Sequence, residues 1–364
     1  AIILHGMHFP APRSRSLGSL AVATTVALGG LGGAASAVVD GAALLELGDN
    51  PKVVVLDSGV SDSTRTIKFG KKYPERFFNM GISEGDMVCT AAGLATTGKI
   101  PFATSFACFL LGRTMDQVLV RVAYSNTNVK LVGTHSGVAV GEDGPTAQTI
   151  VDLAYTRAIP NMVVIQPADY EEAVQATKAL AEYVGPAYLR LGRPSVKGVY
   201  STDYKFRIGK GHVLNQGKDV VIFATGIMVQ ESLKAMETLK KDNISVTVVN
   251  ISTLKPIDKD LIIAQAKKNG AVVTAEDHNK IGGLGDAVFD VLMSNDVFVP
   301  IQKVGANDTF AETGTTEQLF EKYGLSANHI AKAVRAVVKK KAKEKPKQIK
   351  KTVKKLAAKT KKVV

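Results

Sequence analysis

Short apolar runs alternate with longer polar or amphipathic stretches from residue 51 onward. Runs rich in Val, Ile and Leu, bounded by Gly and Pro, are typical of buried β-strands. Six such runs precede residue 200 and four follow it: 52–58, 76–82, 101–106, 129–136, 161–169 and 186–194, then 219–226, 244–252, 270–278 and 298–305. Residues 170–184 show helical spacing of apolar residues, and further helices are expected to begin near Met228, Asp258 and Gly285.

This alternation predicts an α/β protein with two successive domains. Each domain should hold a mostly parallel sheet flanked by helices on both faces. A loop-rich connector, "GRPSVKGVYSTDYKFRIGKG", separates the two series of strands. We therefore predict four segments: an atypical Gly/Ala-rich amino-terminal segment at 1–38, a first α/β domain at 39–198, a second at 199–338 and a Lys-rich, disordered tail at 339–364.

The charge of the chain belongs to its tail. The net charge is +13, and residues 339–364 hold thirteen lysines against one glutamate. The rest of the chain is therefore nearly neutral, which gives no sign of nucleic-acid binding by the two domains. The tail is expected either to bind polyanions weakly or to act as a solvated extension. It contains no aromatic residue, so base stacking is excluded.

The two cysteines, Cys89 and Cys108, provide no disulfide framework or CxxC metal motif. Both stand in apolar sequence, and we expect buried free thiols. This usage fits a reducing compartment, so a cytoplasmic location is predicted.

The amino-terminal segment allows other interpretations. No residue between Arg15 and Asp40 is charged, and the segment ends in small residues, as a secretory signal does. Its many Gly, Ala and Thr residues suit a membrane span poorly, so no membrane association is expected. Gly30, Gly32 and Ala35 match a GxGxxA dinucleotide fingerprint, but Gly/Ala-rich sequence produces this match by chance.

The carboxylate of Glu84 stands where a strand-like run turns into a small-residue helix, in "GISEGDMVCTAAGLA". An acidic residue at such a place can simply stabilise the amino end of the helix. The alternative is a catalytic acid in an apolar setting, and the neighbouring motifs favour it.

Six motifs follow one another in an order that resembles the carboxy-terminal half of transketolase, over about residues 50–338. "GISEGDM" is similar to that family's "GIAEQNM", with Gly85 and Asp86 in place of Gln and Asn. The others are "PFATSFACF", "TMDQVLVRVA", "GTHSGVAVGEDGPTAQ", "RAIPNMVVIQPAD" and "LRLGRP". The resemblance implies a pyrimidine-binding domain followed by a transketolase carboxy-terminal domain, and thiamine diphosphate as cofactor.

The resemblance implies a cofactor-binding and catalytic role for Glu84, whose carboxylic acid would hydrogen-bond a ring nitrogen of the aminopyrimidine. A helix end favours the anion by ~0.3–1 kcal/mol, whereas full burial disfavours it by about 4 kcal/mol. We therefore expect Glu84 to hold or share a proton. Phe106 and Phe109 would bind the cofactor by stacking on its aromatic ring.

The same resemblance implies a substrate site for phosphorylated sugars. His135 would contact the sugar hydroxyls and take part in catalysis, and Asp143 would bind the hydroxyl beside the carbonyl. Arg193 and Ser63 would hold the phosphate, a task that suits the planar guanidinium group.

Besides Gly85 and Asp86, two positions depart from the family pattern. Ala147 replaces the histidine of "GPTHQ", and Ala37 stands where many members carry an arginine that binds phosphate. Both departures are expected to weaken the reaction or the binding of sugar phosphates.

No "GDG" segment followed by an asparagine occurs, so the diphosphate and metal site of the family is expected elsewhere. We predict no metal ligands in this chain and a partner, the amino-terminal transketolase subunit, that holds Mg²⁺ or Ca²⁺ together with the diphosphate. By resemblance the assembly is an α₂β₂ heterotetramer.

The predicted function is reversible transfer of a two-carbon ketol group between phosphorylated ketoses and aldoses, as in the pentose phosphate pathway. The alternatives are a related enzyme, either 1-deoxyxylulose-5-phosphate synthase or the beta subunit of a 2-oxoacid dehydrogenase. A non-catalytic scaffold that binds polyanions is a further alternative.

Overall fold

The computed structural model describes the backbone of residues 36–360 and the side chains of residues 41–343. The predicted signal-like segment and the GxGxxA match lie outside the described residues. The position of Ala37 falls within helix α1 (Ser36–Leu47), but its side chain is not among those described.

The first sheet has seven strands in the order β10-β5-β6-β4-β3-β1-β2. Six of them run parallel, and β10 pairs antiparallel with β5 at the edge. The strands are β1 (Val53–Asp57), β2 (Phe77–Asn79), β3 (Ile100–Phe106), β4 (Lys130–Thr134), β5 (Val163–Ile165), β6 (Ala187–Arg190) and β10 (Thr253–Lys255).

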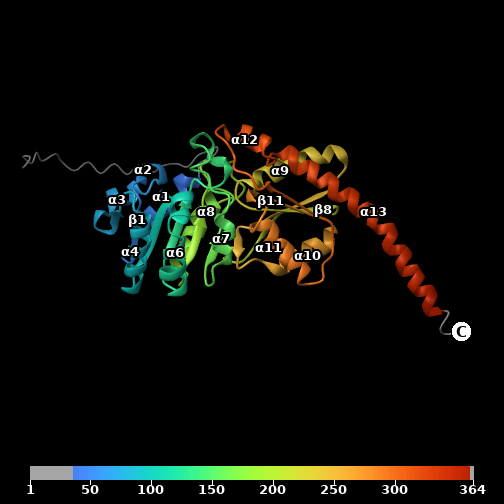
Figure 1. Ribbon diagram of the computed structural model, residues 1–364, viewed down its shortest axis with the longest axis horizontal. Coiled ribbons are helices and arrows are strands. Elements are labelled where there is room, and N and C mark those ends of the chain that lie inside the picture. The colour runs from blue at the N-terminus through green and yellow to red at the C-terminus, as the bar shows by residue number, and fades with distance from the viewer. Residues whose placement is uncertain (1–35, 361–364) are drawn as a thin grey trace, which may run out of the picture. The chain divides into compact units, whose positions relative to one another are not determined.

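Helices cover both faces of this sheet, as expected for parallel strands. Besides α1, the helical segments of this half of the chain are α2 (Ser61–Thr64), α3 (Ile67–Lys72), η1 (Pro74–Arg76), α4 (Glu84–Thr96), α5 (Ala107–Gly112), α6 (Met115–Gln117), η2 (Val118–Tyr124), η3 (Val138–Asp143), α7 (Asp152–Ala158) and α8 (Tyr170–Glu182). Figure 1 shows strand β1 of this sheet among helices α1, α3 and α4.

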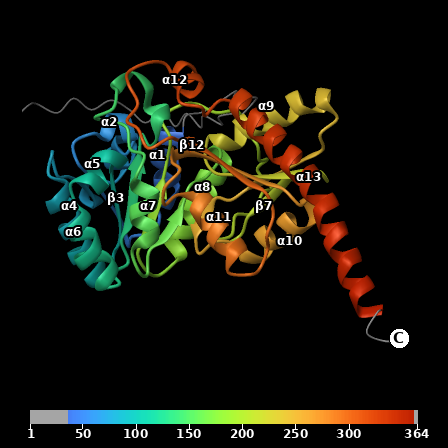
Figure 2. The ribbon, with the colours of Figure 1, turned by 45° about the vertical axis from the view of Figure 1, so that its right-hand side comes forward.

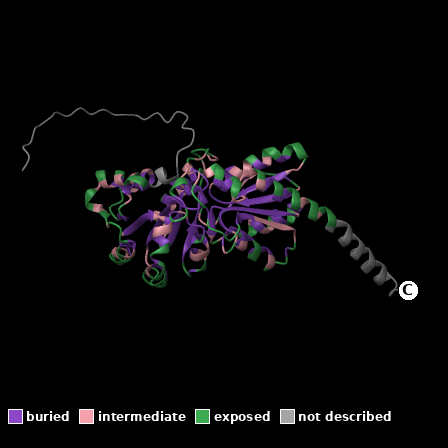
Figure 3. Cartoon of the chain, turned by 45° about the horizontal axis from the view of Figure 1, so that its top comes forward, coloured by how far each residue is buried: buried purple, intermediate pink, exposed green. Residues whose placement is uncertain are grey.

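Strand β1 shows why these strands are apolar throughout. Val53 and Val55 contribute to one buried cluster, whereas Val54 and Leu56 contribute to another. Successive side chains of a strand point to opposite faces, so both faces of the sheet are covered. Figure 3 shows most of the strands as buried; the short edge strand β2 is an exception, with two of its three residues exposed.

The second sheet has five strands in the order β12-β11-β8-β9-β7 (Figure 2). Only β7 is antiparallel, to β9. The strands are β7 (His212–Asn215), β8 (Val220–Ala224), β9 (Val246–Asn250), β11 (Val272–Asn279) and β12 (Ile301–Ala306); the helices are α9 (Met228–Leu239), η4 (Lys240–Asp242), α10 (Lys259–Asn269), α11 (Leu284–Met293), α12 (Thr316–Lys322) and α13 (Ala327–Thr360).

All ten predicted strands are present, as are the helices expected from Met228, Asp258 and Gly285. The two-domain α/β class is confirmed. Two short edge strands, β7 and β10, were not predicted. Strand β10 follows β9 of the second sheet but pairs with β5 of the first, so the second half of the chain completes the first sheet.

The last described helix extends into the segment for which the composition predicts a disordered tail. Helix α13 begins on the second domain, where it packs against α9 and β12, and the helix continues to Thr360. Lys and Ala have high helix propensity, which accounts for the continuation. Within residues 36–360, no helix combines the length and apolar character that a membrane span requires.

The expectation of two buried thiols is wrong for Cys89, which is exposed, whereas Cys108 is partly buried. Cys89 lies on α4, whose buried face is formed by Met87, Val88 and Ala91. Its apolar neighbours in sequence therefore face the core while Cys89 faces outward. Both thiols are free.

Candidate functional site

The predicted site residues lie around one edge of the first sheet. Phe106 ends β3, His135 follows β4, Arg193 follows β6 and Ser63 lies in α2 after β1. These strands are parallel, so their carboxyl ends meet at the same edge, where α/β proteins form ligand sites.

Glu84 is the first residue of α4 and is only 4% exposed. The side chain of Ser83, which precedes the helix, makes no capping hydrogen bond. The carboxylate therefore supplies negative charge at the amino end of the helix, where the peptide dipoles favour it. The prediction that Glu84 is buried is confirmed.

Arg113 is the partner of Glu84, and sequence reasoning missed it. Its Nη1 donates to both carboxylate oxygens of Glu84, at 2.9 and 3.0 Å. The guanidinium carbon also lies 4.4 Å from the centre of the Phe109 ring. The sequence signal was weak, because Arg113 is merely the one basic residue between Lys99 and Arg121.

Three rings form a row beside this ion pair. The ring centres of Phe109 and Phe106 are 5.8 Å apart, and those of Phe106 and His135 are 3.9 Å apart with nearly parallel planes. The structure thus brings together Glu84, Phe109, Phe106 and His135, which the sequence places up to 51 positions apart.

His135 is held in an unusual backbone conformation, with φ at 54°. Such values are uncommon outside glycine and often mark functional sites. Its Nδ1 lies 3.0 Å from Oγ1 of Thr134. Burial, together with the positive charge of Arg193, lowers the pKa of His135 to about 4, so the imidazole is neutral at pH 7. A neutral ring can donate a hydrogen bond through one nitrogen and accept through the other.

Arg193 lies near the other predicted substrate residue, Asp143. Its Nη1 donates to the carbonyl of Val140 at 2.6 Å and to Glu142 at 2.7 Å, and lies 4.0 Å from Asp143. Both Arg193 and Asp143 affect the pKa of His135, in opposite directions. His135, Asp143 and Arg193 therefore form one electrostatic group.

Ser63 stands apart from this group. It is exposed on α2, which follows β1, and β1 is three strands from β6 in the sheet. At about 4.8 Å per strand, the strand ends are roughly 14 Å apart. A single phosphate does not span that distance. The single chain therefore does not bring Ser63 and Arg193 together, and their joint binding of a phosphate stays a prediction.

Of the two departures from the family pattern, Ala147 is described: it is buried and lies in the turn after Gly144. Its methyl group offers no proton donor or acceptor. The proton transfer assigned by resemblance to a histidine there must come from another group, or be absent.

The first domain and the second match separate family models. Residues 35–198 match the model described as "Transketolase, pyrimidine binding domain", and residues 209–330 match "Transketolase, C-terminal domain".

Known proteins agree with these matches. The chain is 46% identical over 303 residues to a putative transketolase C-terminal section of Methanocaldococcus jannaschii, covering 82% of this chain and 95% of that protein. It is 40% identical over 290 residues to a 6-deoxy-6-sulfo-D-fructose transketolase subunit of a Clostridium species, covering 80% and 90% respectively.

Among solved structures, one titled "Split gene transketolase, inactive beta4 tetramer" superposes with a TM-score of 0.79 at 47% identity, covering 84% of this chain and 99% of that one. The order of the motifs, the two domain matches and these relatives lead to one conclusion. The chain belongs to the transketolase family, of which it carries the pyrimidine-binding and carboxy-terminal domains.

Proposed function

We propose that this chain is the catalytic carboxy-terminal subunit of a two-subunit transketolase that transfers two-carbon ketol groups between phosphorylated sugars. The observation that carries the proposal is the buried carboxylate of Glu84 at a helix end, paired with Arg113, whose guanidinium lies over the ring of Phe109. Family membership implies thiamine diphosphate with a divalent metal ion.

The described residues fit the aminopyrimidine part of this cofactor. The guanidinium of Arg113 is planar, donates N–H groups to Glu84 and lies over the face of Phe109. The aminopyrimidine is likewise planar and carries N–H donors, so an acceptor such as Glu84 and an aromatic face such as Phe109 suit it. Because the Arg113 side chain is 48% exposed, it can move aside at small cost.

When bound, thiamine diphosphate supplies the nucleophilic carbon that takes up the ketol group. Glu84 would hold a proton at a carboxyl oxygen and hydrogen-bond the pyrimidine nitrogen. Phe106 and Phe109 would orient the ring by stacking and exclude water from it. The proton on Glu84 is a prediction for the assembled site, since in the single chain its partner is Arg113.

Three residues would orient the sugar. The neutral imidazole of His135 exchanges hydrogen bonds with sugar hydroxyls, and Asp143 accepts from the hydroxyl beside the carbonyl. Arg193 would bind the phosphate, helped by Ser63 if the substrate or the assembly brings them together. The ion pairs of Arg193 are half-exposed, so an incoming phosphate can compete for its donors.

The proposal includes a partner, because the two matched domains lack the family's amino-terminal section and a similar structure comes from a split gene. That partner would hold the diphosphate and the Mg²⁺ or Ca²⁺ ion, in an α₂β₂ assembly. We place the complex in the cytoplasm and in the pentose phosphate pathway.

The test uses the chain reconstituted with an amino-terminal transketolase subunit. We expect turnover of xylulose 5-phosphate with ribose 5-phosphate, and much less with pyruvate and glyceraldehyde 3-phosphate. The reverse preference would favour 1-deoxyxylulose-5-phosphate synthase, and pyruvate oxidation without sugar transfer would favour a 2-oxoacid dehydrogenase. No turnover would favour a scaffold.

Glu84→Gln is the decisive variant, since it keeps the shape but removes the acid. We expect kcat to fall by about 10²–10⁴-fold, the usual contribution of a general acid or base. The matched control is Asp86→Asn, which removes an exposed carboxylate from the same helical turn. Equal activity in Glu84→Gln and Asp86→Asn would refute the role of Glu84.

A further inference from the structure

A glycine-rich loop carries one of the proposed substrate residues and closely follows another. The loop consists of residues 137–144. It follows β4 and His135 in the chain, and it includes Asp143. Three glycines, Gly137, Gly141 and Gly144, have φ near 80°, and ordering glycine costs more backbone entropy than ordering other residues. Besides the short helix η3 inside the loop, contacts with other segments offset this cost.

Asp277, in strand β11 of the second domain, makes those contacts. Its two carboxylate oxygens accept from the backbone N–H groups of Val138 and Ala139, at 2.8 and 3.1 Å. The carboxylate is fully buried and closes the amino end of the short helix η3. Charged acceptors form stronger hydrogen bonds than neutral ones, so this pair fixes the start of the loop firmly.

The fit leaves no room for adjustment. A Cβ atom on Gly137 would lie 2.1 Å from Oδ2 of Asp277, so any side chain there would displace the carboxylate. Arg190, fully buried and paired with Asp152 at 2.6 Å, donates to the backbone carbonyl of Asp277 at 3.1 Å. Strand β11 is thereby tied to β6 of the first sheet at the same point.

A second contact from the carboxy-terminal domain acts on the same loop. The hydroxyl of Thr316, on α12, donates to the carbonyl of Ala139 at 3.0 Å. Gly141 lies against the carbonyl of Gly314, which a Cβ atom would approach to 3.2 Å. Two separate elements of the second domain thus hold residues 138–141.

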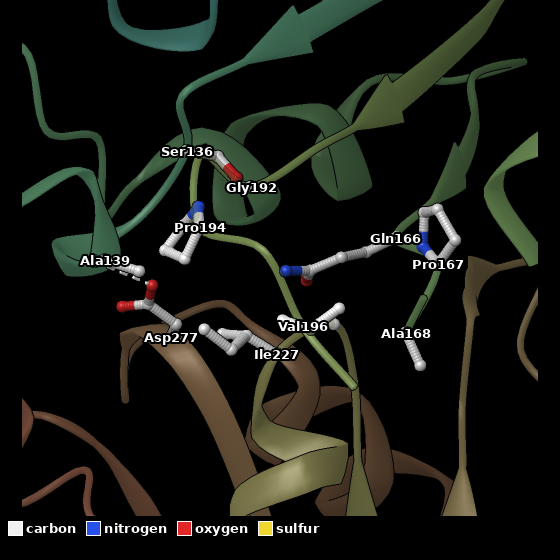
Figure 4. Close-up of a pocket in the computed structure, with 11 residues that line it drawn as sticks. Ser136, Ala139, Gln166, Pro167, Ala168, Gly192, Pro194, Val196, Ile227 and Asp277 are labelled. Atoms are coloured by element: carbon white, nitrogen blue, oxygen red, sulfur yellow. Dashed lines mark hydrogen bonds between the residues drawn. The ribbon is translucent and has the colours of Figure 1, made fainter. Parts of the chain in front are cut away.

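Figure 4 shows Asp277 hydrogen-bonded to Ala139 beside a cavity lined by Ser136, Gln166, Gly192 and Ile227. The cavity measures about 20 Å³. Sites for small molecules usually measure about 300 Å³ or more, so this cavity is a packing gap between the domains. Asp277 is itself buried, and its side chain acts on the loop through Val138 and Ala139.

We propose that Asp277 is a positioning residue through which the carboxy-terminal domain sets the geometry of the sugar-binding loop and hence the recognition of the hydroxyl beside the substrate carbonyl. The recognition part of this inference rests on the proposed function. The structural part does not, because it concerns the conformation of residues 137–144 in the chain itself.

The test compares Asp277→Asn with Glu276→Gln in the full chain. Glu276 is the matched control: it is the neighbouring residue of β11, is fully buried and accepts from two backbone N–H groups. Those groups belong to Leu284 and Gly285 of α11, not to the loop. Any general effect of losing a buried carboxylate from β11 should appear in both variants.

The first readout is amide hydrogen exchange in the isolated chain. In Asp277→Asn the amides of Val138 and Ala139 should exchange at least about tenfold faster, because one charged acceptor is replaced by an amide that cannot serve both donors. Glu276→Gln should leave these two amides as they are. Unchanged exchange in Asp277→Asn would overturn the inference whether or not the complex is active.

The second readout is selectivity in the reconstituted complex. We expect Asp277→Asn to lower the ratio of kcat/KM for an aldose with a 2-hydroxyl to kcat/KM for its 2-deoxy analogue by about tenfold. Glu276→Gln should keep the ratio. Faster amide exchange with an unchanged ratio would overturn the role in recognition, whereas an inactive wild-type complex would refute the proposed function alone.

A further variant tests the inference even if Asp277→Asn does not fold. Thr316→Val keeps the volume of the side chain and removes the hydroxyl that donates to Ala139. It should change both readouts in the same direction by a smaller factor. No change in either readout would count against control of the loop by the second domain.

Discussion

At the scale of single residues, the ion pair between Glu84 and Arg113 shows what sequence motifs find and what they miss. Sequence motifs identify Glu84, Phe106, Phe109 and His135, because each falls within a local pattern. They do not identify Arg113 or Asp277, whose partners lie 29 and 139 positions away. Contacts of that kind depend on how the chain folds back on itself, and one sequence holds no local sign of them.

Arg113 should compete with the cofactor ring for Glu84. Replacing Arg113 with Ala removes an ion pair between a half-exposed arginine and a buried carboxylate, worth about 1 kcal/mol. We expect thiamine diphosphate to bind the reconstituted complex up to about fivefold more tightly, as measured by calorimetry. Arg121→Ala, an exposed cation on η2, is the control. Weaker binding in Arg113→Ala would instead show that Arg113 helps to hold the cofactor.

At the scale of elements, apolar runs predict the strands because both faces of each sheet are buried. Strand β1 is the clearest case, with every residue buried. The edge strands β7 and β10 have four and three residues, and their partly exposed or mixed sequences resemble loops. Their pairing is set by the neighbouring strand, which is why sequence patterns miss them.

The amino end of α11 supports a prediction about pH. Burial raises the pKa of Glu276 from 4.5 to about 7, although it accepts hydrogen bonds from Gly285 and Leu284. Between these two pH values the folded chain keeps a proton that the unfolded chain has released. The contribution of Glu276 to the free energy of unfolding therefore falls by about 3 kcal/mol as pH rises from 4.5 to 7, and is constant above that range.

Chemical denaturation of wild type and Glu276→Gln at several pH values measures this effect. The difference in unfolding free energy between the two proteins should change by about 3 kcal/mol across this range, with wild type losing stability relative to the variant as pH rises. A difference that does not depend on pH would show that Glu276 titrates as an ordinary carboxyl.

At the scale of the whole molecule, the sequence predicts the two domains but not how they cooperate. Strand β10 completes the first sheet, and Asp277 reaches the loop of the first domain. The carboxy-terminal domain therefore helps to hold the candidate site in its conformation. Neither feature has a pattern that could be recognised in sequence, since both arise from packing between the two halves.

Removing the Lys-rich tail tests separately whether the tail binds RNA and whether it is needed for ketol transfer. Lys341 donates to the carbonyl of Asp219, so truncation should begin after it. Removing residues 345–364 deletes nine lysines. We expect unchanged ketol transfer, and loss of the salt-dependent binding of single-stranded RNA measured by fluorescence anisotropy. If RNA binding survives truncation, the tail does not provide it; if transfer is lost, the tail belongs to the enzyme.

The central claim is that Glu84 activates the cofactor ring. Exchange of the thiazolium C2 proton for deuterium, followed by NMR in the reconstituted complex, measures this activation without any sugar. We expect exchange in Glu84→Gln to be at least about 100-fold slower than in wild type, with Asp86→Asn close to wild type. Exchange in Glu84→Gln at the wild-type rate would contradict the account.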